Sequence, residues 1–119
     1  MSTQDKAVDR IALLQGTLDL LILRTLLFGG QHGQGIARAI QQSSDDVLLV
    51  DHGSLYPALQ RLEERGWIKA TWGVSGTNRR ARFYGLTRSG RAQLVRGADQ
   101  WRRLVAAMGR VLGPESAGS

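Results

Sequence analysis

Hydrophobic side chains recur at helical spacing in four stretches of the chain, which predicts four helices. The first stretch follows Thr17, a favourable N-cap, and places Asp19 in the first turn, where the helix dipole stabilises negative charge. Its apolar residues, Leu18 and Leu21 among them, occupy nearly every position around the helix up to Leu27. A helix that is apolar nearly all round must be covered on more than one side, so we expect a second subunit to supply part of that cover.

The segment after this helix is rich in glycine, and glycine-rich loops can bind phosphate groups. However, Arg38 stands where a dinucleotide-binding fingerprint needs its third glycine, and the loop over residues 29–35 follows a helix instead of a strand. We therefore expect no nucleotide site here. A second helix is predicted over residues 35–42, and Val-Leu-Leu-Val at residues 47–50 predicts a short strand.

The third helix is placed by a proline and a glycine. Proline lacks an N–H and is tolerated in the first turn, so Pro57 is expected no deeper than about the third helical position. This puts the N-cap at Ser54, a favourable capping residue. Gly66 is expected to end the helix in a C-cap role.

The two sides of this third helix differ in chemistry. Leu55, Leu59 and Leu62 share one apolar face at helical spacing. The other side carries polar and cationic groups with an aromatic ring on its flank, namely Tyr56, Pro57, Gln60, Arg61 and Glu64. Such a surface can enter a DNA major groove, and the same pattern also fits an ordinary amphipathic surface helix.

A β-hairpin follows this helix. Residues 67–72 and 79–86 predict its two strands, and residues 73–78, Gly-Val-Ser-Gly-Thr-Asn, predict the turn between them. The turn is longer than a two-residue loop and is flanked by arginines. The return strand is itself rich in arginine and aromatic residues, so this hairpin is a candidate for contact with an anionic partner.

The fourth helix is predicted to run from Thr87 to about Leu112, where Gly113 and Pro114 stop it. It carries a heptad-like stripe with spacings of four and three, formed by Leu94, Ala98, Trp101, Val105, Met108 and Leu112. Because a long helix leaving a small domain finds little core to pack on, we expect a dimer seam, with packing back on its own domain as the alternative.

The order of these elements predicts a winged helix-turn-helix, a mostly α fold with a small β-wing. We expect a flexible arm at residues 1–13 and the DNA-binding domain at residues 14–86. A C-terminal dimerisation helix then covers residues 87–112, and a disordered tail covers residues 113–119.

The charge distribution supports a nucleic-acid partner. The net charge is +6, but residues 1–60 contribute −2 and residues 61–110 contribute +9. Eleven of the twelve cations in the second segment are arginines, which suit bidentate contact with phosphate or guanine. An asymmetry of this kind is typical of proteins that bind nucleic acids or membrane surfaces.

Other function classes find little support in the composition. Cysteine is absent and only His32 and His52 could act as bases near neutral pH, so we expect no enzyme, no metal site and no cofactor. The longest apolar run, at residues 18–28, is interrupted by charges and is too short to span a bilayer. We expect a soluble, cytoplasmic protein.

Four sequence motifs resemble those of the PadR family of bacterial transcriptional regulators. They are Gly16-Thr-Leu-Asp-Leu-Leu-Ile-Leu, Gly53-Ser-Leu-Tyr-Pro-Ala-Leu-Gln-Arg-Leu-Glu, Gly66-Trp-Ile and Tyr84-Gly-Leu-Thr-Arg-Ser-Gly. The resemblance covers about residues 14–105, and the short C-terminal part is similar to the compact branch of that family, with one long helix.

The resemblance implies a homodimeric repressor that binds double-stranded DNA. For a two-fold dimer, the expected operator is a pseudo-palindrome. By matched position, the contacts come from the third predicted helix, which is the recognition helix, and from the β-hairpin, which is the wing. The DNA-binding residues expected in this way are Ser54, Tyr56, Gln60, Arg61, Lys69, Thr77, Asn78, Arg79 and Arg80. We expect the wing arginines to supply affinity, while Tyr56 and Gln60 supply part of the specificity.

The resemblance also implies dimerisation through the first and last helices, and effectors that loosen DNA binding. The expected interface residues are Leu18, Leu21, Leu94, Ala98, Trp101, Val105 and Met108. Two interpretations of Trp101 remain open: it packs in the seam, or it lines a pocket for a small hydrophobic or aromatic effector at the dimer interface.

Two further hypotheses remain beside DNA binding. A winged helix can serve as a protein–protein adaptor without sequence-specific DNA binding, although the basic second half argues against this. The last helix is basic and has an apolar stripe, so binding to a membrane surface is the other hypothesis. We expect no membrane partner, because the family motifs favour DNA.

Overall fold

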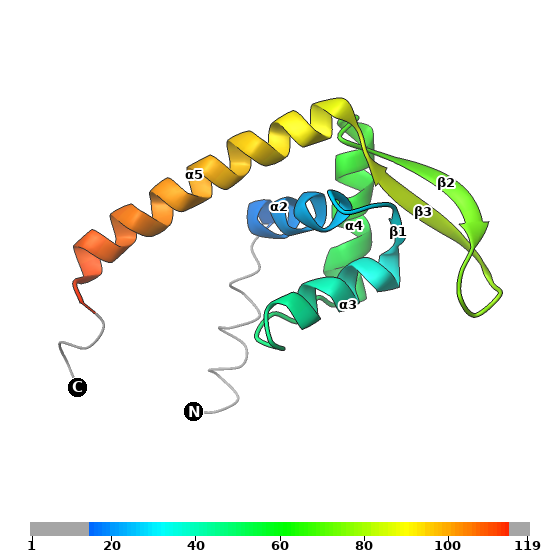
Figure 1. The fold of residues 1–119 in the computed structure, drawn as a ribbon, viewed down its shortest axis with the longest axis horizontal. Helices are drawn as coiled ribbons and strands as arrows, with labels where there is room; N and C mark the ends of the chain where they lie inside the picture. The colour runs from blue at the N-terminus through cyan, green and yellow to red at the C-terminus, as the bar shows by residue number, and fades with distance from the viewer. Residues whose placement is uncertain (1–14, 115–119) are drawn as a thin grey trace.

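A computed structural model of the chain describes residues 15–114 and shows a small helical domain from which a β-hairpin and a long helix project (Figure 1). The predicted arm at residues 1–13 lies outside the described residues, as does the tail beyond residue 114. In order, the elements are α2 (Gln15–Leu26), β1 (Gln31–His32), α3 (Gly33–Ser43), α4 (His52–Glu64), β2 (Ile68–Val74), β3 (Arg80–Leu86) and α5 (Arg88–Leu112).

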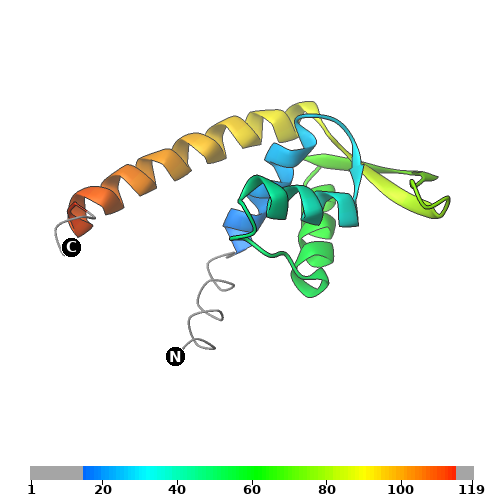
Figure 2. The same ribbon diagram turned by 60° about the horizontal axis from the view of Figure 1, so that its bottom comes forward.

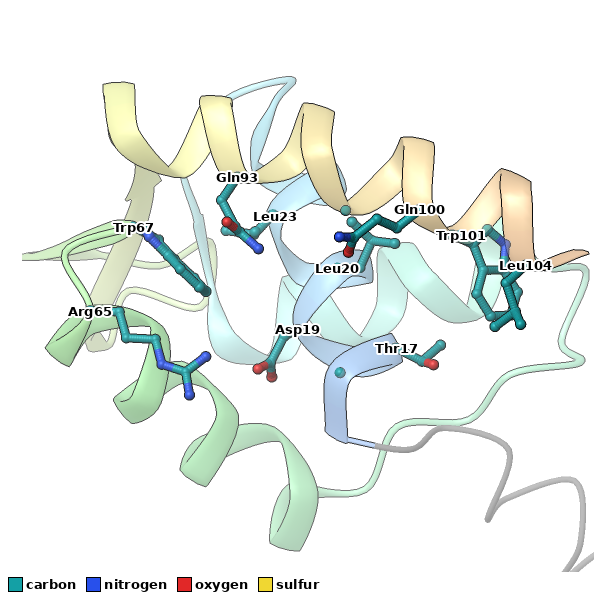
Figure 3. A pocket seen from close by; sticks show the side chains of 12 residues that line it. Thr17, Asp19, Leu20, Leu23, Arg65, Trp67, Gln93, Gln100, Trp101 and Leu104 are labelled. Atoms are coloured by element: carbon teal, nitrogen blue, oxygen red, sulfur yellow. The ribbon is translucent and has the colours of Figure 1, made fainter.

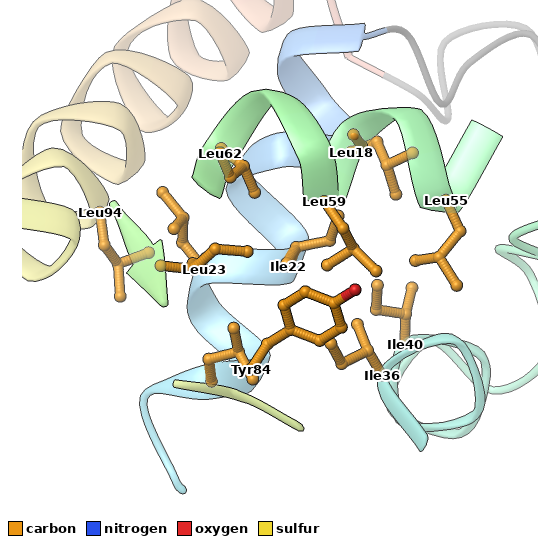
Figure 4. Close-up of a cluster of buried hydrophobic side chains, with 13 residues drawn as sticks. Leu18, Ile22, Leu23, Ile36, Ile40, Leu55, Leu59, Leu62, Tyr84 and Leu94 are labelled. Carbon is orange, nitrogen blue, oxygen red and sulfur yellow. The ribbon is translucent and has the colours of Figure 1, made fainter. Parts of the chain in front are cut away.

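One hydrophobic core lies where α2, α3 and α4 meet the base of the hairpin (Figure 4). Leu55, Leu59 and Leu62 point into it from α4, which confirms the apolar face predicted for that helix. Tyr84 enters from β3, and its ring lies among the leucine and isoleucine side chains. Burying this apolar area is the main force that holds α4 in place and leaves its other side exposed.

The start of α4 differs from the prediction. The helix begins at His52 with Asp51 as its N-cap, whose carboxylate accepts a hydrogen bond from the Ser54 amide at 2.8 Å. Pro57 is therefore the sixth helical residue, and the prediction that it lies no deeper than the third is wrong. A proline here removes only the hydrogen bond to the Gly53 carbonyl, and Gly53 is exposed to water that can replace it.

The end of α4 agrees with the prediction. Gly66 has a positive φ of 75° directly after the helix, a conformation that glycine adopts without steric cost. The Gly66 amide donates to the Glu63 carbonyl, and the Trp67 amide donates to the Leu62 carbonyl, both at 3.0 Å. These two bonds form a Schellman motif, which turns the chain directly into β2.

The sheet has three antiparallel strands in the order β1-β3-β2. The strand predicted at residues 47–50 is absent: these residues pair with no strand of the sheet, whose third strand is the two-residue β1. Leu48 and Val50 pack against the core while Val47 and Leu49 are exposed, so this apolar run contributes to the core without pairing as a strand.

The first turn of α2 also differs from the prediction. The helix already includes Gln15, so Thr17 lies inside it and is not its N-cap. Asp19 is buried at 8% exposure and accepts a hydrogen bond from Arg61 of α4 at 3.0 Å. Asp19 therefore lies beyond the first turn in which it was predicted, and its carboxylate joins α2 to α4.

Helix α5 begins and ends as predicted, with Thr87 as N-cap and Gly113 after its last turn. Its base is fixed to the turn after α4, because the hydroxyls of Thr87 and Ser89 both donate to the Gly66 carbonyl, at 2.6 and 2.9 Å. At Gly90 a side chain would collide with the Trp67 carbonyl, so helix and turn are in direct backbone contact. From this base the helix extends away from the domain (Figures 1 and 2).

Two of the residues predicted for the dimer interface belong to the core of the single chain. Leu18 and Leu94 are 2% and 6% exposed. Their assignment to a dimer interface is therefore wrong, because they have no surface left to offer a second subunit. Leu21 and Ala98 are half-buried, and Trp101, Val105 and Met108 are exposed.

Candidate nucleic-acid interface

The exposed side of α4 is formed by its N-terminal half. Ser54, Tyr56, Pro57 and Gln60 are exposed, whereas the leucines of the same helix are buried. Tyr56 is 43% exposed, and its ring lies directly over the first residue of α3, Gly33. A Cβ at Gly33 would meet the Tyr56 hydroxyl at 2.8 Å, so the absence of a side chain at Gly33 allows the ring to lie there.

The wing turn is held by its own polar groups. The amide of Ser75 donates to the Arg79 carbonyl at 2.8 Å, and the hydroxyls of Ser75 and Thr77 are hydrogen-bonded at 2.9 Å. Asn78 has a φ of 60°, a left-handed conformation that asparagine tolerates better than most residues. This turn presents Arg79 and Arg80 to solvent.

A groove of about 620 Å³ separates the wing from the start of α3 and from Tyr56, and we call it the wing groove. It is lined by His32, Gly33, Gln34, Arg38, Tyr56, Trp72, Ser75, Gly76, Thr77, Arg79, Arg80, Ala81, Arg82 and Tyr84. Four arginines and no carboxylate are among these lining residues, so the groove suits an anion. A second hollow, of about 480 Å³, adjoins it and includes Gln60.

One arginine of the groove is neutralised from the recognition helix. Arg82 of β3 donates to the Glu63 carboxylate of α4 at 2.8 Å. Below this pair, burial raises the pKa of Tyr84, while the charge of Arg82 acts in the opposite direction. The ion pair connects the wing to α4, and the neighbouring phenol stays neutral over the physiological range.

Four predicted DNA contacts, Tyr56, Thr77, Arg79 and Arg80, line the wing groove, whereas Ser54, Gln60, Arg61, Lys69 and Asn78 do not. Arg61 forms an ion pair with Asp19, and the two side chains are only 28% and 11% exposed. This guanidinium lies between α2 and α4, so the prediction that Arg61 shares the exposed side of the helix with Gln60 overestimated its exposure. Lys69 is exposed on β2, but it alternates with Ile68 and therefore lies on the face of the wing that points away from the groove.

The outer part of α5 forms a second exposed surface. Its large apolar residues Trp101, Leu104, Val105, Met108, Val111 and Leu112 are between 46% and 86% exposed. Between α5 and α2 lies a cavity of about 430 Å³, with Trp67 and Arg65 at one end and Trp101 and Leu104 at the other (Figure 3). Trp101 thus borders both the exposed stripe and this cavity.

The model of the Transcriptional regulator PadR-like family matches residues 22–96, which include α3, the recognition helix and the wing. The chain belongs to this family. It is therefore a transcriptional regulator, and the family resemblance and the winged-helix fold predicted from the sequence are both confirmed.

Solved structures of similar proteins have the same fold. A PadR family regulator from Eggerthella lenta is 26% identical, with 98% of each chain covered and a TM-score of 0.74. One from Clostridium difficile is 29% identical, with 80% of this chain and 97% of that chain covered and a TM-score of 0.69. A transcriptional regulator from Clostridium thermocellum is 25% identical, with 86% of this chain and 99% of that chain covered and a TM-score of 0.77.

Among sequence relatives, an uncharacterised protein from Lysinibacillus sphaericus is 28% identical over 92 residues, which are 77% of this chain and 84% of that protein.

Sequence reasoning missed the contribution of α3 to the wing groove of this PadR-like chain. Gln34 and Arg38 line the wing groove from the exposed side of α3, whereas Ile36 and Ile40 are buried on its other side. The signal was available, because Gln34 and Arg38 are four residues apart and so share the helical face opposite the isoleucines. His32 also caps α3, accepting a hydrogen bond from Gly35 through Nδ1 at 3.1 Å.

Neither a cluster of metal-ligating side chains nor a membrane-spanning helix is found among residues 15–114 of the PadR-like chain. No cluster of three or more histidine, aspartate or glutamate side chains in this part of the chain could hold a metal ion. None of the described helices combines the length and the apolar character that crossing a membrane requires.

Proposed function

We propose that this PadR-like regulator binds double-stranded DNA sequence-specifically as a homodimer and represses transcription. The observation that carries the proposal is the position of two features side by side. The exposed N-terminal half of α4 borders the wing groove through Tyr56, and arginines line that groove without a carboxylate among them. A recognition helix and a cationic wing on one face suit a DNA duplex.

Each part of the interface has its own role in the proposal. Ser54, Tyr56 and Gln60 of α4 reach base edges in the major groove and supply specificity. Thr77, Asn78, Arg79 and Arg80 of the wing bind the phosphate backbone and supply affinity, helped by Arg38 of α3. Arg61 is assigned to the stability of the fold, and Lys69, on the outer face of β2, is assigned a long-range electrostatic effect only.

The exposed stripe of α5 supports a homodimer. Trp101, Val105 and Met108 are large apolar side chains at heptad spacing, and each leaves about half of its surface, between 46% and 51%, exposed in the single chain. A second copy of the same helix matches such a stripe, because a two-fold interface pairs the same surface of both subunits. The resulting dimer would read a pseudo-palindrome whose half-sites lie one helical turn, or a multiple of it, apart.

The cavity between α2 and α5 supports a site for an effector that relieves repression. Its walls combine Leu20, Leu23 and the indole of Trp67 with polar groups such as Gln93 and Gln100. An apolar cavity with a few polar side chains suits a small aromatic molecule. Trp101 can then both pack in the dimer seam and line the effector pocket, because it borders the cavity as well as the exposed stripe of α5.

The proposal is tested by binding to a labelled fragment of the chain's own upstream promoter region, over a salt series, with random DNA as competitor. We expect binding that survives the competitor and weakens steeply with salt, because bound phosphates release counterions. Equal affinity for promoter and random DNA would contradict autoregulation through a specific operator. No binding even at low salt would overturn the DNA-binding function and favour a protein–protein adaptor.

A further inference from the structure

An exposed tryptophan lies on the inner face of the wing. Trp72 of β2 is 60% exposed and lines the wing groove together with Tyr56 and Arg38. Its direction follows from the pairing of the strands, in which Trp72 stands opposite Arg82. Arg82 reaches Glu63 of α4 from that face, so Trp72 also faces the recognition helix.

Trp72 holds the neighbouring arginine. The guanidinium of Arg80 lies over the indole ring, 4.6 Å from its centroid, which is within the range of a cation–π interaction. Arg80 forms no ion pair with a carboxylate of residues 15–114, whereas Arg82 is paired with Glu63. Of these two arginines, Arg80 is therefore the one that keeps its charge available while its position is fixed.

A different aromatic residue packs the two strands of the hairpin together. Phe83, on the opposite face, packs so closely on Gly73 that a Cβ there would meet its ring at 2.8 Å. The Phe83 ring also contacts His32 edge to face, with 5.6 Å between centroids. Trp72, by contrast, leaves more than half of its surface in water, which is costly for an indole that serves only the fold.

We infer that Trp72 is a DNA contact of the wing: its indole packs on the sugar of the duplex backbone and positions Arg80 against a phosphate. The inference rests on the proposed DNA-binding function and adds a residue to it. An aromatic plane suits this role because it offers an apolar surface to deoxyribose on one side and a negative face to the guanidinium on the other. A phosphate contact made by a preoriented arginine loses less side-chain freedom on binding.

The first test observes the side chain directly in the full chain. The sequence has three tryptophans, and Trp67 and Trp101 line the cavity between α2 and α5, away from the wing groove. After incorporation of 5-fluorotryptophan, ¹⁹F NMR gives one resonance for each, and the Trp72→Phe variant identifies that of Trp72. On addition of a mixed-sequence duplex of about three helical turns at low salt, we expect the Trp72 resonance to shift and to lose its solvent accessibility.

The second test asks whether Trp72 acts by positioning Arg80 or only through the size of its own side chain. We expect Trp72→Ala to weaken binding to that duplex about fivefold and to lower the salt slope, as Arg80→Ala does, because Arg80 loses its support. Trp72→Phe keeps an aromatic plane and should restore most of the affinity. The Trp72→Ala/Arg80→Ala double variant should lose less than the product of the two single losses, because the two side chains act together.

The outcomes distinguish this inference from the proposed function. If the wild-type chain binds the duplex while the Trp72 resonance stays in place, or while Trp72→Ala binds with unchanged affinity and salt slope, the inference is wrong and the DNA-binding function stands. If the wild-type chain does not bind DNA, both are overturned. Circular dichroism of Trp72→Ala and Trp72→Phe confirms that each loss comes from a folded protein.

Discussion

The carboxylate of Asp19 in α2 accepts a hydrogen bond from the guanidinium of Arg61 in α4 at 3.0 Å. This pair joins the first helix of the domain to the recognition helix where both side chains are largely withdrawn from water. A partly buried ion pair is costly to break, because the remaining charge keeps its desolvation penalty without its partner. Arg61 thus supports the recognition helix from behind.

We predict that Arg61→Ala lowers the free energy of unfolding by about 2 kcal/mol, because it leaves the Asp19 carboxylate without its partner. Urea denaturation measures this loss, and Arg88→Ala, an exposed arginine at the start of α5, is the control. The salt slope of DNA binding should be unchanged. A stable Arg61→Ala protein whose slope is lower by about one would instead assign Arg61 to a phosphate.

The contact between Tyr56 and Gly33 makes a second prediction. In Gly33→Ala the new methyl group would lie 2.8–3.1 Å from three atoms of the Tyr56 side chain, the hydroxyl oxygen and two ring carbons, so the ring must move. We expect about tenfold weaker operator binding, because one misplaced contact of the recognition helix costs about 1–3 kcal/mol. Gly109→Ala is the control, since nothing lies within 4 Å of a Cβ there. Equal operator affinity for both variants would contradict a role for Tyr56 in recognition.

The wing arginines make a prediction about salt. Arg80→Ala should weaken binding to operator and random DNA by similar factors and reduce the salt slope by about one, because one phosphate contact is lost. Fluorescence anisotropy over a salt series measures the slope for both DNAs. The matched control is again Arg88→Ala, which removes an equal charge outside the wing groove. A loss confined to the operator would mean that Arg80 reads a base.

The stripe on α5 makes a prediction about assembly. Val105 is 49% exposed, so Val105→Arg should leave the single domain folded while it places a charge in the proposed seam. Sedimentation equilibrium should give twice the chain mass of 13.0 kDa for the wild-type protein and the single mass for the variant. Arg103→Gln, in the exposed Asp99–Arg103 pair, should remain dimeric. A monomeric wild-type protein would overturn the dimer.

Tyr84 makes a prediction at alkaline pH. Its pKa is raised above the ordinary value of 10.0, mainly because burial disfavours the phenolate. The folded state therefore binds the proton more tightly than the unfolded state, and the resulting stability is present below pH 10 and lost as pH rises through the folded pKa. Urea denaturation of wild type and Tyr84→Phe between about pH 9 and 11 should show this decline in the wild type only. Parallel declines would contradict the assignment to Tyr84.

Much of the fold could be predicted from local signals. The spacing of Leu55, Leu59 and Leu62 gave the buried face of α4, and Gly66 and Thr87 marked the end of one helix and the start of another. These signals are reliable because each depends on a single element, either on helical periodicity or on the conformation of one residue.

Two of the errors have their physical origin in contacts between elements. Periodicity put Arg61 on the outer side of α4, but only the position of α2 shows that Asp19 captures it. Likewise, the heptad stripe of α5 continues smoothly through Leu94, and only the packing of the helix base shows that this residue is buried. Predicting such contacts requires the arrangement of the helices, which no local pattern contains.

The contact between Gly90 and the Trp67 carbonyl, with the two hydroxyls on the Gly66 carbonyl, has a geometric consequence. It fixes the angle at which the long helix leaves the end of the recognition helix, with no linker to absorb a change. In the proposed dimer, the separation of the two recognition helices is then set by backbone contacts at this junction. A shift of one α5 against the other would change the spacing between the two half-sites that the dimer reads. The junction between α4 and α5 therefore determines the half-site spacing that the dimer can bind.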